Sequence, residues 1–286
     1  MKFYRAYVEI TNICGLECNF CPTKINPTHT MKLDFFEKVL YQLSPYTKEI
    51  ALHVMGDPLI LTNINMYLDL AYKHGFKVMI TTSGYYLNQH SNIFHPSLKQ
   101  INISLNSFNK NSTKKTFEEY MSGIFSLCQN RVNEDIFINL RLWNLDDKGS
   151  ENSYNKQIFD RLEKYFKIKF PKDLLINPPK SFRLDKKILL HFDSYFEWPS
   201  LQSSHFSHNF CHGLSSQIAI LADGRIVPCC LDGDGIIELG NLHTNSLEDI
   251  LETQRVKKIQ KNFKNNIAYE ELCQKCTFKD RFNENL

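Results

Sequence analysis

Two hydrophobic periods alternate along the first half of the chain. Short apolar, β-branched runs are each followed by a stretch whose apolar residues lie three or four positions apart, the spacing of an amphipathic helix. The expected strands are 7–11, 50–55, 76–82, 100–105 and 136–142, and the expected helices are 33–43, 64–71, 117–127 and 158–166. Strands that alternate with helices predict βα units around a parallel sheet.

This alternation yields about five or six βα units, fewer than the eight of a closed barrel. We therefore expect an α/β fold in which residues 1–170 form a partial (βα)6 TIM-like barrel. In such sheets the loops after the carboxyl ends of the strands build the binding site. Gly56-Asp57-Pro58 and Ser83-Gly84 both fall at expected strand ends.

The pattern changes after residue 170. Prolines interrupt residues 171–210 repeatedly, which predicts a linker with a sixth strand near 174–176. Beyond it, two β-like runs, 217–221 and 225–227, flank Asp223-Gly224, a strong hairpin-turn signal. Ser246 is a good N-cap for a following helix. Residues 211–286 should therefore form a small domain built from a β-hairpin and a helix.

Composition narrows the class of protein. A net charge of +3 over 286 residues gives no argument for a nucleic-acid partner. The chain has no apolar run as long as a membrane span, and its first ten residues are too polar for a signal peptide. We expect a cytoplasmic protein without a membrane partner. Nine cysteines in such a protein indicate metal or redox chemistry rather than disulfides.

Three cysteines, Cys14, Cys18 and Cys21, lie on the loop after the first expected strand. Three thiolates on one short loop can bind three irons of a cubane and leave the fourth iron open. An open iron can chelate the amino and carboxylate groups of S-adenosylmethionine (SAM), so that the cofactor supplies the radical and the protein supplies its placement. The alternative is a zinc loop, which needs a fourth ligand from His29 or a distant residue.

The spacing CxxxCxxC, with Phe20 directly before the last cysteine, resembles the radical SAM superfamily, and the resemblance extends over nearly the whole chain. It implies a [4Fe-4S] cluster on Cys14, Cys18 and Cys21 that cleaves SAM reductively to methionine and a 5′-deoxyadenosyl radical. It also implies that Phe20 lies near the adenine of SAM.

The same resemblance implies further SAM contacts. Met55-Gly56-Asp57 stands where the family has a Gly-Gly-Glu type motif for the amino group of SAM, with Met for the first Gly and Asp for Glu. The positions that match ribose or carboxylate contacts are Ser83, Ser104 and Asn106, and those that face SAM or substrate are Asn139 and Arg141. Taken by themselves, polar residues at strand ends are equally well explained by turn chemistry.

A second set of cysteines, Cys211, Cys229, Cys273 and Cys276, lies in the C-terminal part. Its spacing resembles the short "twitch" version of the SPASM auxiliary-cluster domain and implies a second [4Fe-4S] cluster. Four thiolates would saturate that cluster, which leaves electron transfer or domain folding as its role. The alternative is a structural zinc site with four cysteine ligands. Because ten residues follow Cys276, we expect one auxiliary cluster.

Other reactive residues have plainer interpretations. Cys230 adjoins Cys229, and neighbours on a strand point to opposite faces, so only Cys229 is expected to bind iron. Cys128 is expected to be a buried structural thiol. Glu9, His53 and Arg141 fall on expected barrel strands, where a polar side chain either binds substrate or has a partner in the core. These three are the catalytic candidates.

The sequence thus predicts an enzyme that abstracts hydrogen from a substrate in the partial barrel, with net oxidation if the auxiliary cluster accepts an electron. The resemblance suggests either dehydrogenation of a small polar molecule such as an aminocyclitol, or modification of a peptide or protein. Since the chain starts at its first expected strand, we favour the small molecule, or an activating role on another protein. A reducing partner such as flavodoxin or ferredoxin is implied. The rival from another class is a zinc-binding module that uses its basic helix, 255–264, on nucleic acid.

Overall fold

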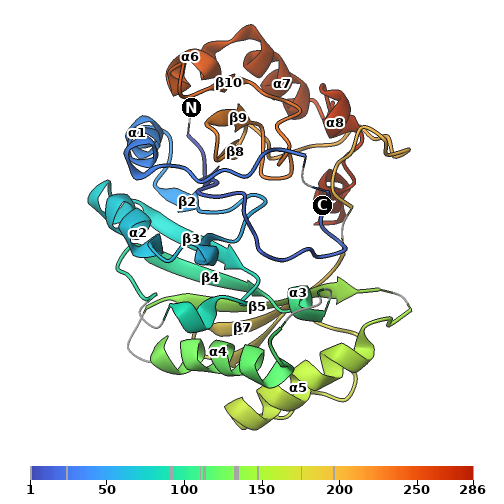
Figure 1. Cartoon of the computed structure of the whole chain (residues 1–286). Coiled ribbons are helices and arrows are strands. Elements are labelled where there is room, and N and C mark those ends of the chain that lie inside the picture. The colour runs from blue at the N-terminus through green and yellow to red at the C-terminus, as the bar shows by residue number, and fades with distance from the viewer. Residues whose placement is uncertain are drawn as a thin grey trace.

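The computed structural model describes residues 2–23, 25–90, 93–109, 111, 114–131, 135–146, 148–174, 176–195 and 197–285, with side chains to residue 282. Its described strands form one open sheet in the order β10-β9-β8-β1-β2-β3-β4-β5-β7-β6 (Figure 1). The strands are β1 (Arg5–Val8), β2 (Glu49–Ala51), β3 (Lys77–Thr82), β4 (Leu98–Ser104), β5 (Phe137–Leu145), β6 (Ser181–Asp185), β7 (Ile188–Ser194), β8 (Gln217–Ile220), β9 (Arg225–Val227) and β10 (Gly240–Asn241). From β1 through β5 to β7 the neighbours are parallel. The partial (βα)6 barrel is confirmed.

Four helices cover the outer face of these parallel strands: α1 (Leu33–Leu43), α2 (Ile64–Lys73), α4 (Phe117–Asn130) and α5 (Asn152–Phe166) (Figure 1). α1 turns Phe36, Val39, Leu40 and Leu43 toward the sheet, as its apolar period predicts. α4 begins with a capping box between Thr116 and Glu119. No helix among the described residues has the length and apolar character needed to cross a bilayer.

The two faces of the sheet differ sharply in polarity. Ala6, Val8 and Ile101 point toward the helices and are fully buried in the main apolar core. Alternate residues of the same strands, such as Tyr7 and Asn102, point to the inner face. A partial barrel with a polar inner face can hold a polar ligand, which places the site there.

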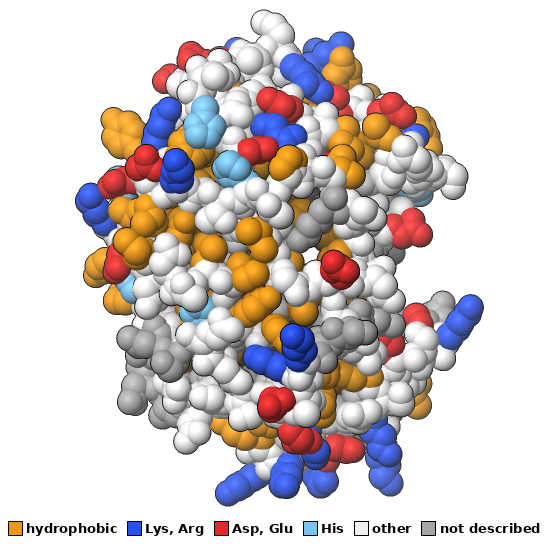
Figure 2. All heavy atoms as spheres, viewed as in Figure 1, with side chains coloured by type: hydrophobic (Ala, Val, Ile, Leu, Met, Phe, Trp, Pro, Cys, Tyr) orange, Lys and Arg blue, Asp and Glu red, His pale blue; other side chains and the backbone are white. Residues whose placement is uncertain are grey.

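The C-terminal hairpin continues the same sheet. β8 lies parallel to β1, with Tyr7 opposite Ala219, and pairs with β9 through the predicted turn at Asp223-Gly224. The helices α6 (Leu247–Glu252), α7 (Gln254–Lys264) and α8 (Glu271–Gln274) follow, and the predicted N-cap Ser246 accepts a hydrogen bond from Asp249 N. The surface mixes both signs of charge, and its right edge is hollowed between the upper and lower halves (Figure 2).

The prediction of a sixth strand near 174–176 is wrong. Leu174 N donates to Pro171 O and Ile176 N donates to Asp173 O, so this segment is a turn; Leu175 lies outside the described residues. The sixth parallel strand is β7, which pairs with β5 and with the antiparallel β6. The turn forms because Pro171 precedes the segment and Pro178-Pro179 follows it, whereas 188–192 is an uninterrupted β-like run.

Candidate active site

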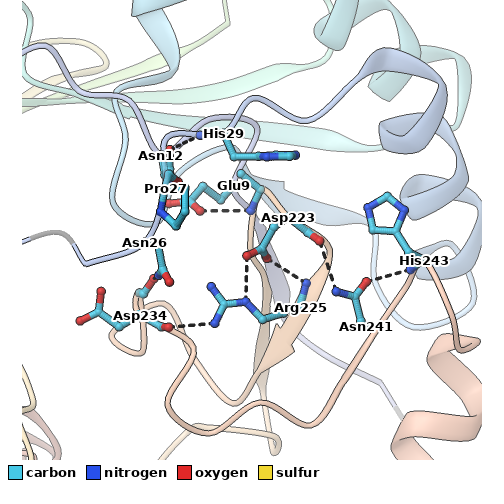
Figure 3. Close-up of polar contacts among 12 residues, drawn as sticks. Glu9, Asn12, Asn26, Pro27, His29, Asp223, Arg225, Asp234, Asn241 and His243 are labelled. Atoms are coloured by element: carbon cyan, nitrogen blue, oxygen red, sulfur yellow. Dashed lines mark hydrogen bonds and ion pairs between the residues drawn. The ribbon is translucent and has the colours of Figure 1, made fainter.

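The cysteine loop after β1 is closed at its base by hydrogen bonds that involve no cysteine. Thr11 and Thr30 form an isolated β-bridge. Asn12 Nδ2 donates to Pro27 O over 2.8 Å, and Asn12 Oδ1 accepts from His29 N over 2.7 Å (Figure 3). The loop therefore has a defined shape before any metal is considered.

Within this loop the thiols of Cys18 and Cys21 lie next to each other. Cys21 N donates to Cys18 O over 3.0 Å. A hydrogen bond from Cys21 and further ones from Asn111 and Ser107 lower the pKa of Cys18 to about 6, against the effect of burial. The donor atom of Asn111, Nδ2, lies 3.0 Å from Cys18 Sγ. A thiol stabilised as thiolate is suited to bind iron.

The loop after β2 packs directly against the cysteine loop. A β-carbon on Gly56 would lie 2.0 Å from Thr11 O, and Asp57 N donates to Ile13 O over 3.0 Å. Only glycine fits such a close backbone approach. The structure thus brings the Met55-Gly56-Asp57 motif beside the three cysteines, as the resemblance implies.

The side chain of Asp57 is used inside the protein. Its Oδ2 atom accepts hydrogen bonds from Thr82 Oγ1 (2.9 Å), Ser83 N (2.9 Å) and Ser83 Oγ (2.7 Å), and its Oδ1 atom accepts one from Leu59 N (3.0 Å). Burial nevertheless raises the pKa of Asp57. These bonds join the ends of β2 and β3 beneath the cysteine loop, and they occupy both Asp57 and Ser83.

Along β5 and directly after β4, in contrast, two buried side-chain oxygens have no partner among the described residues. Asn106 Oδ1 and Asn139 Oδ1 are buried without a hydrogen bond from any described residue. Ser104 on β4 lies opposite Arg141 on β5. The Cζ atom of Arg141 lies 4.5 Å from the centroid of the Trp143 ring. Burial lowers the pKa of Arg141 to about 10. Buried polar atoms without partners fit a bound polar cofactor such as SAM.

Phe20 packs against an aromatic ring that sequence reasoning missed. Its ring centroid lies 5.3 Å from that of Tyr195, whose hydroxyl donates to Glu151 Oε1 over 2.8 Å. Glu151 is 4% exposed and also accepts from Asn109 (3.1 Å) and Asn144 (2.9 Å). Tyr195 falls in the stretch interpreted as a linker, where no periodic signal marks it.

The three catalytic candidates occupy different settings. Glu9 is 2% exposed and accepts from Met55 N (2.8 Å) and Ala222 N (3.1 Å), so it ties the β2 loop to the C-terminal hairpin. His53 lies edge-on to Tyr7, and its buried Nδ1 atom has no partner among the described residues. Burial, then the charge of Arg141, lowers the pKa of His53 to about 3. His53 is therefore neutral at neutral pH.

The four C-terminal cysteines, Cys211, Cys229, Cys273 and Cys276, line one cavity. Burial raises the pKa of each thiol, to about 11 for Cys211. No three His, Cys, Asp or Glu side chains in the described parts of the chain converge as a single metal ion requires. Four thiols that line one cavity can hold a four-iron cluster.

The two remaining cysteines lie away from that cavity. Cys230 forms a hydrogen bond with Tyr7 and packs in a small apolar cluster with Val54 and Ala219. Cys128 is 4% exposed, and burial raises its pKa to about 12. Cys128 is thus the buried structural thiol that was predicted, and Cys230 faces the inner side of the sheet.

Hydrogen bonds also join the N-terminal loop to the hairpin region. Asn26 Nδ2 donates to Gly233 O over 3.2 Å. Arg225 binds Asp223 Oδ2 (2.8 Å) and the carbonyl oxygen of Asp234 (2.9 Å), which shapes the segment that Asn26 contacts (Figure 3). A β-carbon on Gly233 would lie 2.4 Å from Met55 Cγ. The two cysteine sets therefore belong to one packed region.

Comparison with known protein families agrees with this geometry. Residues 8–147 match the model of the Radical SAM superfamily, and residues 211–277 match the SPASM model, an iron-sulfur cluster-binding domain. The chain belongs to the radical SAM superfamily. No curated protein matches the sequence.

Solved structures share the fold of this radical SAM protein at low sequence identity. BtrN in complex with AdoMet (SAM) and 2-DOIA is 13% identical, with a TM-score of 0.57 over 97% of this chain and 94% of that one. anSMEcpe with bound AdoMet is 14% identical, with a TM-score of 0.58 over 96% and 86%. Streptococcus suis SuiB bound to precursor peptide SuiA is 13% identical, with a TM-score of 0.50 over 99% and 73%.

Both matched domains imply cofactors. A radical SAM domain with a SPASM domain implies a SAM-binding [4Fe-4S] cluster and an auxiliary cluster. The radical SAM enzyme thus has two cysteine sets for two clusters, which argues against the rival zinc module.

Proposed function

We propose that this radical SAM enzyme catalyses the net oxidation, a dehydrogenation, of a small polar molecule bound on the inner face of the partial barrel. When bound, SAM and its cluster supply a hydrogen-abstracting radical, and the auxiliary cluster supplies a one-electron acceptor. The observation that carries the proposal is that the adjacent residues Cys229 and Cys230 connect the auxiliary cavity to the inner face of the sheet. Cys229 lines the auxiliary cavity, and Cys230 contacts Tyr7 on the inner face.

For SAM, Cys14, Cys18 and Cys21 hold the cluster, and Phe20 lies along the adenine. Because four internal donors bind the side chain of Asp57, the backbone carbonyls of Met55 and Gly56 would accept from the amino group of SAM. The polar groups left for ribose and carboxylate are Ser104, Asn106, Asn139 and Arg141. Ser83 positions Asp57 instead of touching SAM.

For the substrate, the inner face supplies Tyr7, His53 and Arg141. His53 keeps an unpartnered Nδ1, and its pKa of about 3 makes it a hydrogen-bond partner for a substrate hydroxyl and a poor proton acceptor at neutral pH. Glu9 is held by two backbone amides and positions the hairpin relative to the β2 loop.

A cavity of small-molecule size opens beside Tyr195, and Tyr7, His53 and Arg141 do not line it. This cavity of about 990 Å³ lies at the carboxyl ends of β5 and β7, with Tyr195 in its wall. Typical small-molecule sites occupy about 300–1,000 Å³. BtrN, which shares the fold of this chain, was crystallised with AdoMet and 2-DOIA.

Peptide or protein modification is the second candidate. SuiB was crystallised with precursor peptide SuiA, and anSMEcpe with the Kp18Cys peptide. Both share the fold of this chain. A reducing partner of the flavodoxin or ferredoxin class is needed for either reaction.

The first experiment is anaerobic reconstitution of the wild type and of the Cys14/Cys18/Cys21→Ala variant. Iron and sulfide are counted, and 5′-deoxyadenosine is measured after reduction with SAM. We expect about eight irons in the wild type and about four in the variant, which cleaves no SAM. About four irons in the wild type and none in the variant would remove the auxiliary cluster and with it the oxidation.

A matched variant, Cys273/Cys276→Ser, tests the oxidation directly. It should keep 5′-deoxyadenosine formation and lose oxidation of the substrate, because its auxiliary set lacks two ligands. Candidate substrates are small polyols and amino alcohols, with a cysteine-containing peptide for comparison. Modification of the peptide alone would support the second candidate.

A further inference from the structure

Lys279 is a lysine buried beside the auxiliary cysteines. It is 1% exposed and lines the same cavity as the four thiols. Its Nζ atom donates to Cys276 O over 2.7 Å and to Gln274 O over 3.3 Å. Lysines are almost never fully buried unless they are paired with negative charge.

Among the described carboxylates, the neighbouring Asp280 feels the charge of Lys279, but the two side chains form no ion pair. Asp280 accepts from Ser207 Oγ (2.8 Å) and Asn209 Nδ2 (2.5 Å), and it pairs with His205 at 2.9 Å. No described Asp or Glu oxygen lies within ion-pair distance of Lys279 Nζ. An isolated ammonium in the interior is costly, so a counter-charge is required.

The cavity itself holds the candidate counter-charge. Lys279 lines this cavity together with Cys211, Cys229, Cys273 and Cys276, and it donates to the backbone of Cys276. Four thiolates around iron carry net negative charge, and one added electron makes it more negative. A fixed positive charge in a medium of low polarity favours the more negative state.

We propose that Lys279 is a positioning residue that raises the reduction potential of the auxiliary cluster and so makes it a better electron acceptor. The inference rests on the proposed function, because it assumes a cluster on Cys211, Cys229, Cys273 and Cys276. Lys279 supplies the charge, and its bonds to Cys276 O and Gln274 O fix that charge at the end of α8.

The test uses the Cys14/Cys18/Cys21→Ala protein, in which the auxiliary cluster is alone. Lys279→Met keeps the length of the side chain and removes the charge, whereas Lys279→Arg keeps the charge. Each variant is reconstituted, its iron is counted, and its midpoint potential is measured by redox titration followed by electron paramagnetic resonance. Lys279→Gln serves as a second neutral variant.

We expect about four irons in every variant. At a fixed solution potential the ratio of reduced to oxidised cluster should fall at least tenfold in Lys279→Met, a shift of about 59 mV for one electron. The ratio in Lys279→Arg should stay within about threefold of the parent.

Other outcomes overturn the inference. An unchanged potential in Lys279→Met and Lys279→Gln, with full iron, means that the charge does not act on the cluster. Equal loss of iron in Lys279→Arg and the neutral variants means that Lys279 acts through packing alone. A parent protein without iron overturns both this inference and the proposed function. The other two outcomes overturn this inference alone, so the two failures can be distinguished.

Discussion

A β-carbon on Gly15 would lie 1.8 Å from the hydroxyl oxygen of Tyr86. Gly15 sits between Cys14 and Cys18 with a φ of 71°, and Tyr86 follows β3. Gly15→Ala should therefore distort the cysteine loop. We expect reduced iron on the first cluster and a large loss of 5′-deoxyadenosine formation. Gly75 is the matched control, because its φ is 72° and nothing lies within 4 Å of its β-carbon position.

The control separates backbone strain from the clash. Gly75→Ala should cost about 1–2 kcal/mol of unfolding free energy and keep full iron and activity. The double variant Gly15→Ala/Tyr86→Phe removes the clashing hydroxyl and should recover part of the iron and activity lost in Gly15→Ala. Equal losses in Gly15→Ala and the double variant would show that the close contact with Tyr86 is irrelevant.

A second prediction concerns the hydrogen bond from Asn111 to Cys18. In iron-free protein, alkylation of Cys18 by iodoacetamide should rise with a midpoint near pH 6, because the thiolate forms above that value. Asn111→Ala removes a donor that favours the thiolate, which raises the pKa. At pH 6 alkylation should slow roughly 5- to 10-fold.

Peptide mapping by mass spectrometry assigns the alkylation to Cys18. Asn109→Ala is the control, because the Asn109 side chain contacts Glu151 and not a thiol. Its pH profile should match the wild type. An identical midpoint in Asn111→Ala would contradict the prediction.

The elements predicted well are those whose signal is local. α1 runs from Leu33 to Leu43, the range that its apolar period predicts, because a helix that packs one face on a sheet must repeat every 3.6 residues. The sequence also predicts that the loops at the strand ends lie beside the cysteine loop, and the reason there is the direction of the strands. Once the sheet is parallel, its carboxyl ends lie at one edge.

The residues that sequence reasoning missed depend on distant partners. Lys279 lies in an ordinary polar stretch, and it lines one cavity with Cys211 and Cys229, which are far earlier in the chain. The internal partners of Asp57, Thr82 and Ser83, lie at the end of the next strand along the chain, and a SAM contact of Asp57 stays a prediction. The strand expected at 174–176 failed because a short apolar run between prolines does not distinguish a turn from a strand.

A third prediction tests Asp57 as a structural acceptor. Asp57→Asn places an amide donor against hydroxyl and amide donors from Thr82 and Ser83, so buried donors lose their acceptor. We expect the free energy of unfolding in urea to fall by about 2–4 kcal/mol. Ser83→Ala removes one donor, leaves the carboxylate in place, and should cost about 1–2 kcal/mol.

The same variants separate this role from direct SAM binding. If Asp57 acts through structure, Ser83→Ala should keep most SAM affinity, as measured by equilibrium binding to the reconstituted protein. Unchanged stability of Asp57→Asn together with lost SAM binding would instead place the Asp57 side chain on the cofactor.

The last prediction concerns Tyr195, which holds the ring of Phe20 at a centroid distance of 5.3 Å. Tyr195→Ala removes the ring contact, which is worth about 0.5–1.5 kcal/mol for an aromatic pair. If Phe20 lines the adenine site, the dissociation constant of SAM should rise roughly 2- to 12-fold. Tyr195→Phe keeps the ring and loses the bond to Glu151, so its affinity for SAM should fall less.

Tyr154→Phe, which loses a buried bond to Leu105 O, is the control and should bind SAM normally. Equal weakening in Tyr195→Ala and Tyr154→Phe would mean that the effect is general destabilisation, and that Tyr195 does not position Phe20.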